Sequence, residues 1–163
     1  MKEIAEKTTL CPSARPEPGE SFVFGIIGGT VAEPRVAYLK QPQPITDELI
    51  AKVSPVTPAE VFRTASTCAT NGCQHFDGKN CGLATRIVEN LPTVGEELPP
   101  CFIRRDCRWW QQEGKAACMR CPQVITDNYN ASELSIQVAT PTARYLNILY
   151  HNLIVKNKIL ADY

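Results

Sequence analysis

The chain has 163 residues, with 17 lysines and arginines against 17 aspartates and glutamates, so its formal net charge is zero. This length is enough for one domain with a modest core, and the neutral total provides no overall attraction to nucleic acid or to an acidic membrane. No stretch approaches the ~18 apolar residues of a membrane span. Residues 1–10 lack the apolar region of a secretory signal. We therefore expect a soluble protein of the cytoplasm, without a membrane partner.

In chain order, residues 1–20 are rich in proline and charge and predict an irregular N-terminal segment. Two apolar runs, residues 21–27 and a run through Val36 and Leu39, flank Gly28-Gly29 and predict a β-hairpin. Pro34 lacks the amide donor that a central strand needs, so the second strand is expected at an edge or bulge. A short helix is predicted near residues 46–53.

Two further helices are predicted in the middle of the chain. Thr57, Pro58 and Glu60 match an N-cap, a first helical position and a capping box. The apolar positions that follow have helical spacing and predict a helix that reaches residue 69: Val61, Phe62, Ala65, Cys68 and Ala69. Asn80 is expected to cap the second helix, which ends at Pro92. Cys81 would lie in its first turn, where the helix dipole favours a thiolate.

Asp106 is expected to cap a short helical segment that stops near Gly114, while residues 123–126 and 133–139 are β-prone. Residues 142–163 have apolar side chains at helical spacing and predict an amphipathic helix that packs on the domain or on a second copy in a homodimer. Together these elements predict an α+β fold. A Cys-rich metal-binding domain, residues 21–141, lies between the segment 1–20 and the helix 142–163.

Eight cysteines are many for a chain of this size, and seven of them lie between residues 68 and 121. Disulfide scaffolds are typical of shorter secreted chains, whereas in a reducing compartment clustered thiols indicate metal binding. Disulfides stay the alternative if the chain is a processed precursor.

The seven cysteines form two groups. Cys68, Cys73 and Cys81 follow the spacing C-x4-C-x7-C; the other group, C-x5-C-x10-C-x2-C-P, contains Cys101, Cys107, Cys118 and Cys121. Zinc ribbons use two close CxxC pairs, because four sulfurs surround one ion with ~2.3 Å bonds. Here one such pair is present. The wide gaps and the terminal Cys-Pro favour iron–sulfur clusters over zinc, with one or two clusters, most of all 4Fe-4S. This cysteine segment, rich in arginine and tryptophan, resembles bacterial iron–sulfur proteins in general character.

Local charge supports an anionic centre. Residues 101–122 contain five cations against Asp106 and Glu113: Arg104, Arg105, Arg108, Lys115 and Arg120. A buried cluster with four thiolates is negative and requires nearby positive groups, and Trp109 can shield it from water. The same cations also suit docking on a redox partner with an acidic surface. The neutral total disfavours single-stranded nucleic acid as the partner.

The fourth ligand of the group Cys68, Cys73 and Cys81 is open. His75 lies between two of these cysteines and imidazole can ligate zinc or iron; the distant candidate is Cys11. The third alternative is an iron left open to substrate, as in an enzyme.

The predicted function is electron transfer or redox sensing at iron–sulfur clusters. A zinc-stabilised protein-interaction module is the alternative, and an enzyme with an incompletely ligated cluster is a further one.

Overall fold

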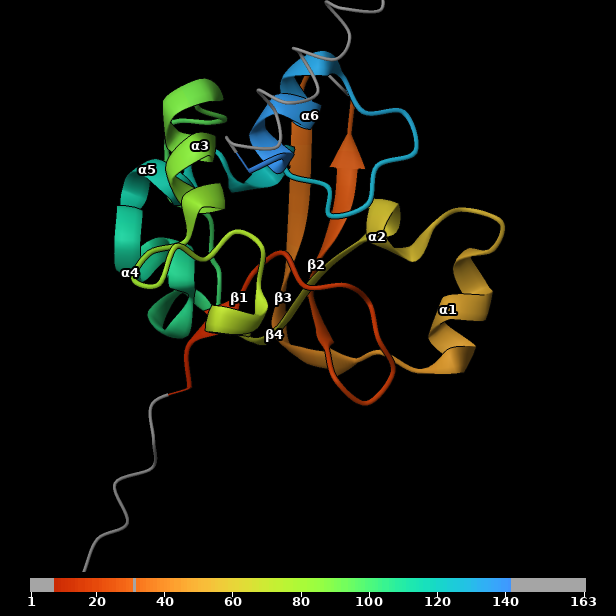
Figure 1. The fold of residues 1–163 in the computed structure, drawn as a ribbon. Helices are drawn as coiled ribbons and strands as arrows, with labels where there is room; N and C mark the ends of the chain where they lie inside the picture. The colour runs from red at the N-terminus through yellow and green to blue at the C-terminus, as the bar shows by residue number, and fades with distance from the viewer. Residues whose placement is uncertain (1–7, 31, 142–163) are drawn as a thin grey trace, which may run out of the picture.

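Four antiparallel strands form the centre of the computed structural model, which describes residues 8–30 and 32–141 (Figure 1). They are β1 (Leu10–Cys11), β2 (Phe22–Gly29), β3 (Pro34–Pro44) and β4 (Phe62–Thr67), in the spatial order β1-β4-β2-β3. The predicted hairpin is confirmed, and β3 lies at an edge of the sheet with Pro34 as its first residue. Residues 8–9 and 12–20 lie outside helices and strands, and the short β1 interrupts them, because Cys11 pairs opposite Ser66 of β4.

Short helices surround the sheet, so the fold is α+β as predicted. The α-helices are α1 (Asp47–Val53), α2 (Pro58–Val61), α3 (Gly82–Asn90), α4 (Arg108–Glu113), α5 (Lys115–Cys118) and α6 (Glu133–Ala139). The 3-10 turns are η1 (Thr70–Gly72), η2 (Arg104–Asp106) and η3 (Cys121–Gln123). Helices α3, α4 and α5 lie on one side of the sheet and α1 on the other (Figure 1). The predicted helix over residues 142–163, and the homodimer it suggested, lie outside the described residues.

The helix predicted from Thr57 to residue 69 is wrong beyond its first turn. Helix α2 ends at Val61, and residues 62–67 form β4, which pairs with β1 on one side and β2 on the other. Tertiary pairing overrides the local helical spacing because a central strand satisfies backbone groups on both edges and buries both faces. Four consecutive residues of β4, from Phe62 to Ala65, are buried.

Three smaller predictions also change. The caps of α3 and α4 are Cys81 and Cys107, each one residue later than the predicted Asn80 and Asp106. The β-prone residues 133–139 form α6 instead of a strand, because the Ser132 hydroxyl accepts the Ser135 amide and starts a helix. The β-prone residues 123–126 are not in a strand either.

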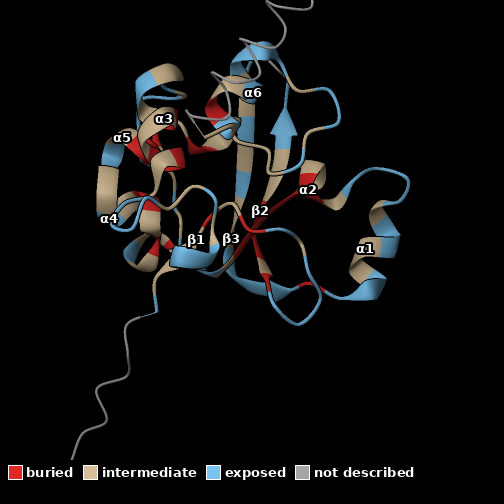
Figure 2. Cartoon of the chain, viewed as in Figure 1, coloured by how far each residue is buried: buried red, intermediate tan, exposed pale blue. Residues whose placement is uncertain are grey.

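The cysteines lie where two parts of the core meet. One face of the sheet packs on α1 and α2 through Val23 and Phe62, together with Ile45 after β3. On the opposite face, Phe24 and Ala65 pack against Ile103, which precedes η2. Beyond that second face, the helical half has its own core, which includes Trp109 and two of the cysteines. Buried residues concentrate in the sheet and on the inner sides of α3 to α5, whereas α1 is largely exposed (Figure 2). Within residues 8–30 and 32–141, no helix has the length and apolar character needed to cross a membrane.

Candidate metal centres

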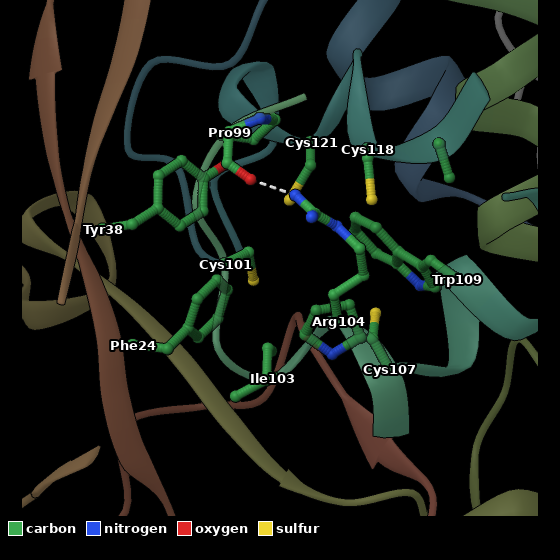
Figure 3. A pocket seen from close by; sticks show the side chains of 12 residues that line it. Phe24, Tyr38, Pro99, Cys101, Ile103, Arg104, Cys107, Trp109, Cys118 and Cys121 are labelled. Atoms are coloured by element: carbon green, nitrogen blue, oxygen red, sulfur yellow. Dashed lines mark hydrogen bonds between the residues drawn. The ribbon is translucent and has the colours of Figure 1, made fainter. Parts of the chain in front are cut away.

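The four cysteines from 101 to 121 surround one cavity beneath the sheet. We call them the C-terminal quartet: Cys101, Cys107, Cys118 and Cys121. The cavity that these residues line is small, with a volume of about 20 Å³. Figure 3 shows the four sulfurs directed into this space, with Tyr38 and Phe24 on one side and Trp109 on the other. The predicted grouping of these four thiols therefore corresponds to a common place in the fold.

Three cysteines of the C-terminal quartet lie at the ends of short helices. Cys107 is the N-cap of α4, and Gly114 ends that helix with a φ of 60°, a conformation that favours glycine. The chain turns there into α5, whose last residue is Cys118, and Cys121 begins η3 three residues later. The wide spacing between Cys107 and Cys118 is therefore spanned by two short helices joined at Gly114.

Burial controls the thiol chemistry of the metal-free quartet. Desolvation raises the pKa of Cys107 to about 12 and that of Cys101 to about 11, and it also raises the pKa of Cys118. Backbone amides of Trp110 and Trp109 donate to the Cys107 sulfur and act in the opposite direction, as does the Ile103 amide at Cys101. Without a bound cation Cys101, Cys107 and Cys118 are therefore protonated at neutral pH. The backbone amides could nevertheless donate to the sulfurs of Cys101 and Cys107 in their thiolate form.

A buried arginine that the sequence analysis missed contacts this quartet. Arg63 lies on β4 and is 1% exposed. Its Nη1 donates to the Cys121 carbonyl, and its Nη2 donates to the Pro12 carbonyl at 2.9 Å and to the Cys121 sulfur at 3.4 Å. The guanidinium carbon is 5.5 Å from the ring centroid of Phe24 and 6.0 Å from that of Trp109. A full positive charge is thus enclosed by aromatic rings, carbonyls and one thiol.

The predicted arginines divide by role. Arg104 donates from its side chain to Cys118 and to the Pro99 carbonyl (Figure 3). Arg108 packs over the Phe76 ring at 5.3 Å. Arg120 instead binds the carbonyls of Leu91 and Ala116, and Arg105 is exposed, so neither reaches a sulfur.

None of the arginines close to the cysteines has a carboxylate partner in the described part of the chain. The ion pairs there join Arg15 to Asp127 and Arg35 to Glu33, both at the surface. Arg63, Arg104 and Arg108 each have a buried Nε without a hydrogen-bond acceptor. Buried cations and unpaired donors are costly, and these three arginines concentrate that cost near the cysteines.

Tyr38 is a further unpaired donor that sequence reasoning did not identify. It lines the cavity of the C-terminal quartet, and its buried hydroxyl has no hydrogen-bond partner. Burial, followed by the neighbouring Cys121, raises the pKa of Tyr38, so the hydroxyl keeps its proton. It can donate only to something placed in the cavity.

The other four cysteines also come together. Burial raises the pKa of Cys11 to about 11, and the charges of Cys68, Cys81 and Cys73 raise it further because these thiols are its neighbours. We call the four the N-terminal quartet, and they are among the many residues that line one wide, open cavity: Cys11, Cys68, Cys73 and Cys81. Cys11, the distant candidate in the sequence, is thus the fourth thiol beside the group of three.

Backbone pairing assembles the N-terminal quartet. Strand β1 brings Cys11 beside β4, and the Cys68 amide donates to the Thr9 carbonyl at 2.9 Å. Cys81 is the N-cap of α3, so the amides of Ala84 and Leu83 donate to its sulfur while burial raises its pKa. An isolated bridge between Phe76 and Cys81 closes the loop that contains Cys73.

His75, the other candidate for the fourth ligand, is close to this quartet and has a hydrogen-bond partner of its own. Its Nδ1 is 2.9 Å from Nη2 of Arg86, and since arginine is only a donor, Nδ1 accepts that hydrogen bond. Burial, and then the Arg86 charge, lower the pKa of His75. The imidazole is therefore neutral with its proton on Nε2, a state in which neither nitrogen is free to bind a metal.

The two quartets are neighbours. Leu10, next to Cys11, forms an isolated bridge with Cys107. Trp109 is 2% exposed and lines both cavities. The predicted shielding role of Trp109 is consistent with this position.

Within the described residues, no three Cys, His, Asp or Glu side chains are grouped closely enough to hold a single metal ion. The thiols of each quartet instead stand around the edge of a cavity.

Comparison of the chain with protein-family models, with curated proteins and with solved structures finds no match.

Proposed function

We propose that the protein is an iron–sulfur protein in which each quartet holds one 4Fe-4S cluster, and that it transfers single electrons or senses redox state. The observation that carries this proposal is the division of the eight cysteines into two sets of four. Strand pairing brings Cys11 across 57 positions of sequence to Cys68. A tetrathiolate set is the usual ligand set of such clusters.

The size of a four-iron core supports clusters over single ions. One zinc ion draws four sulfurs to ~2.3 Å from a common point, which places them ~3.8 Å apart. A cubane binds each thiolate to a different iron, so its ligands are more widely separated. The four sulfurs of the C-terminal quartet face one cavity of about 20 Å³, which would widen around a bound core (Figure 3).

Charge and hydrogen bonding also fit an anionic core. Arg63 and Arg104 each donate to a quartet sulfur, and neither has a carboxylate partner among the described residues. The unpaired hydroxyl of Tyr38 faces the same cavity. Hydrogen bonds and cations around the sulfurs are the means by which a protein sets the potential of a cluster.

Full thiolate ligation favours electron exchange over catalysis at an open iron. With Cys11 included, each quartet supplies four thiols, so neither cluster depends on substrate to complete its ligands. Bound clusters would supply the redox chemistry, and the chain would fix their environment. Arg63 would donate to the Cys121 sulfur, while Trp109 and Ile103 would exclude water from one side of the C-terminal quartet.

The partner we propose is a one-electron redox protein with an acidic docking surface. Arg105 is exposed beside the segment that carries Cys101, and Phe102 is 36% exposed there. The proposed location is the cytoplasm, where thiols stay reduced for cluster assembly.

Anaerobic purification followed by iron, sulfide and zinc analysis tests the proposal. We expect a brown protein with about equal amounts of iron and acid-labile sulfide. Stoichiometric zinc without sulfide would establish the alternative, a zinc-stabilised interaction module. Absence of metal, together with disulfides in mass spectrometry, would refute metal binding altogether.

A further inference from the structure

Arg63 occupies a position that few charged residues adopt. Alternation along β4 directs Arg63 and Ala65 to the sheet face that meets the cysteines, while Phe62 packs on the opposite face. Strand β2 has one extra residue, Phe24, opposite β4, and this bulge brings the Phe24 ring over the guanidinium. The side chain is therefore held in place from several directions.

The guanidinium connects the two quartets. One nitrogen, Nη2, donates both to the carbonyl of Pro12 and to the sulfur of Cys121. Pro12 directly follows Cys11 of the N-terminal quartet, and Cys121 belongs to the C-terminal quartet. Arginine suits this place because its planar fork can serve several acceptors at once.

Resting on the two-cluster function above, we propose that Arg63 is a positioning residue that raises the reduction potential of the C-terminal cluster and holds it beside the N-terminal cluster for electron exchange. Reduction adds one negative charge to a core that is already anionic, and no bond forms or breaks. A nearby fixed cation stabilises the reduced state more than the oxidised state. The electron enters from a one-electron donor protein and passes from one cluster to the other.

Contact geometry determines which cluster responds more. Arg63 donates directly to a sulfur of the C-terminal quartet, at 3.4 Å, but reaches the N-terminal quartet only through the carbonyl of Pro12. Loss of its charge should therefore shift the potential of the C-terminal cluster further than that of its neighbour.

A redox titration of the full chain, followed by electron paramagnetic resonance with dithionite as reductant, tests the proposal. Arg63→Gln removes the charge but keeps a polar side chain of moderate length. We expect the ratio of reduced to oxidised C-terminal cluster, at a fixed potential, to fall at least tenfold, which is about 59 mV for one electron. The matched control is Arg35→Gln, because Arg35 lies on the same sheet, is exposed and pairs with Glu33.

If Arg63→Gln keeps full iron and sulfide, a ratio of reduced to oxidised C-terminal cluster within threefold of the wild-type ratio would overturn the inference. The proposal of two clusters would then still stand. An equal shift in Arg35→Gln would also overturn it, because the effect would then be one of net charge. If Arg63→Gln fails to take up iron, Arg63→Lys decides. Lysine keeps the charge but lacks the planar fork that holds it against the Cys121 sulfur and both carbonyls, so we expect at least a threefold fall; an unchanged ratio refutes the inference. Wild-type protein without clusters would instead refute the proposed function itself.

Discussion

Raised thiol pKa values predict that the metal-free protein loses stability in alkali. In the folded chain burial raises the pKa of Cys11 and Cys101 to about 11 and that of Cys107 to about 12, whereas an unfolded thiol titrates near ~8.5. The folded state therefore keeps protons that the unfolded state has released. This contribution to stability is fully present below pH ~8.5 and is lost as pH rises toward 11–12.

The magnitude follows from the number of retained protons. Each proton that only the folded state keeps lowers the free energy of unfolding by about 1.4 kcal/mol per pH unit, so three thiols give about 4 kcal/mol per pH unit between pH 9.5 and 10.5. Solvent screening of partly exposed thiols reduces this, and we expect at least about 2 kcal/mol per pH unit. Tyr38 contributes only above pH ~10, where unfolded tyrosine begins to ionise.

Urea unfolding of chelator-treated, reduced protein at several pH values, followed by circular dichroism, measures this slope. The variant Cys107→Ala should show a slope shallower by about one proton. With metal bound the thiols are deprotonated in the folded state, so the sign reverses and stability falls on acidification. A free energy of unfolding that stays constant from pH 8 to 10.5 in the metal-free protein would refute the reasoning.

Three further predictions concern single residues. Gly114→Ala should cost about 1–3 kcal/mol of stability and lower the metal content of the C-terminal quartet, because a φ of 60° strains alanine. Gly72→Ala, at an ordinary φ and with its nearest neighbour 3.7 Å from the new methyl group, is the control, and equal denaturation midpoints would contradict this reasoning. His75→Gln should keep its full metal content, since Nδ1 serves Arg86; loss of half the iron would show that His75 is a ligand. Tyr38→Phe should leave the metal-free protein as stable or more stable, because it removes an unpaired buried hydroxyl. In the loaded protein it should lower the potential of the C-terminal cluster, and an unchanged potential would show that the hydroxyl does not donate to the cluster.

The sequence was informative where local chemistry determines local structure. Turn residues and alternating apolar runs predicted the β2–β3 hairpin, and Pro34 placed β3 at the edge. The short helix predicted near residues 46–53 is α1, whose N-cap Thr46 accepts the Leu49 amide. The C-terminal quartet was identified by spacing alone, because its four thiols lie within 21 residues.

Features that depend on distant pairing were not predictable in the same way. Strand β4 has helical apolar spacing, and its conformation is decided by β1 and β2 on its two edges. Misassignment of β4 hid Arg63, which period-two alternation would have placed on a buried face beside Ala65. Cys11 was one of three alternatives for the fourth ligand of the group Cys68, Cys73 and Cys81. The sequence could not decide among them, because Cys11 comes close to Cys68 through the pairing of β1 with β4.

The most direct test of two four-cysteine centres is iron and sulfide content in one variant from each quartet. Wild-type protein assembled anaerobically should hold about eight iron atoms per chain, and Cys11→Ser and Cys121→Ser should each hold about half that amount. The two variants should give different paramagnetic resonance spectra after reduction, because each keeps a different cluster. Full iron in Cys11→Ser, or loss of all iron in either variant, would contradict the assignment of the eight cysteines to two separate centres.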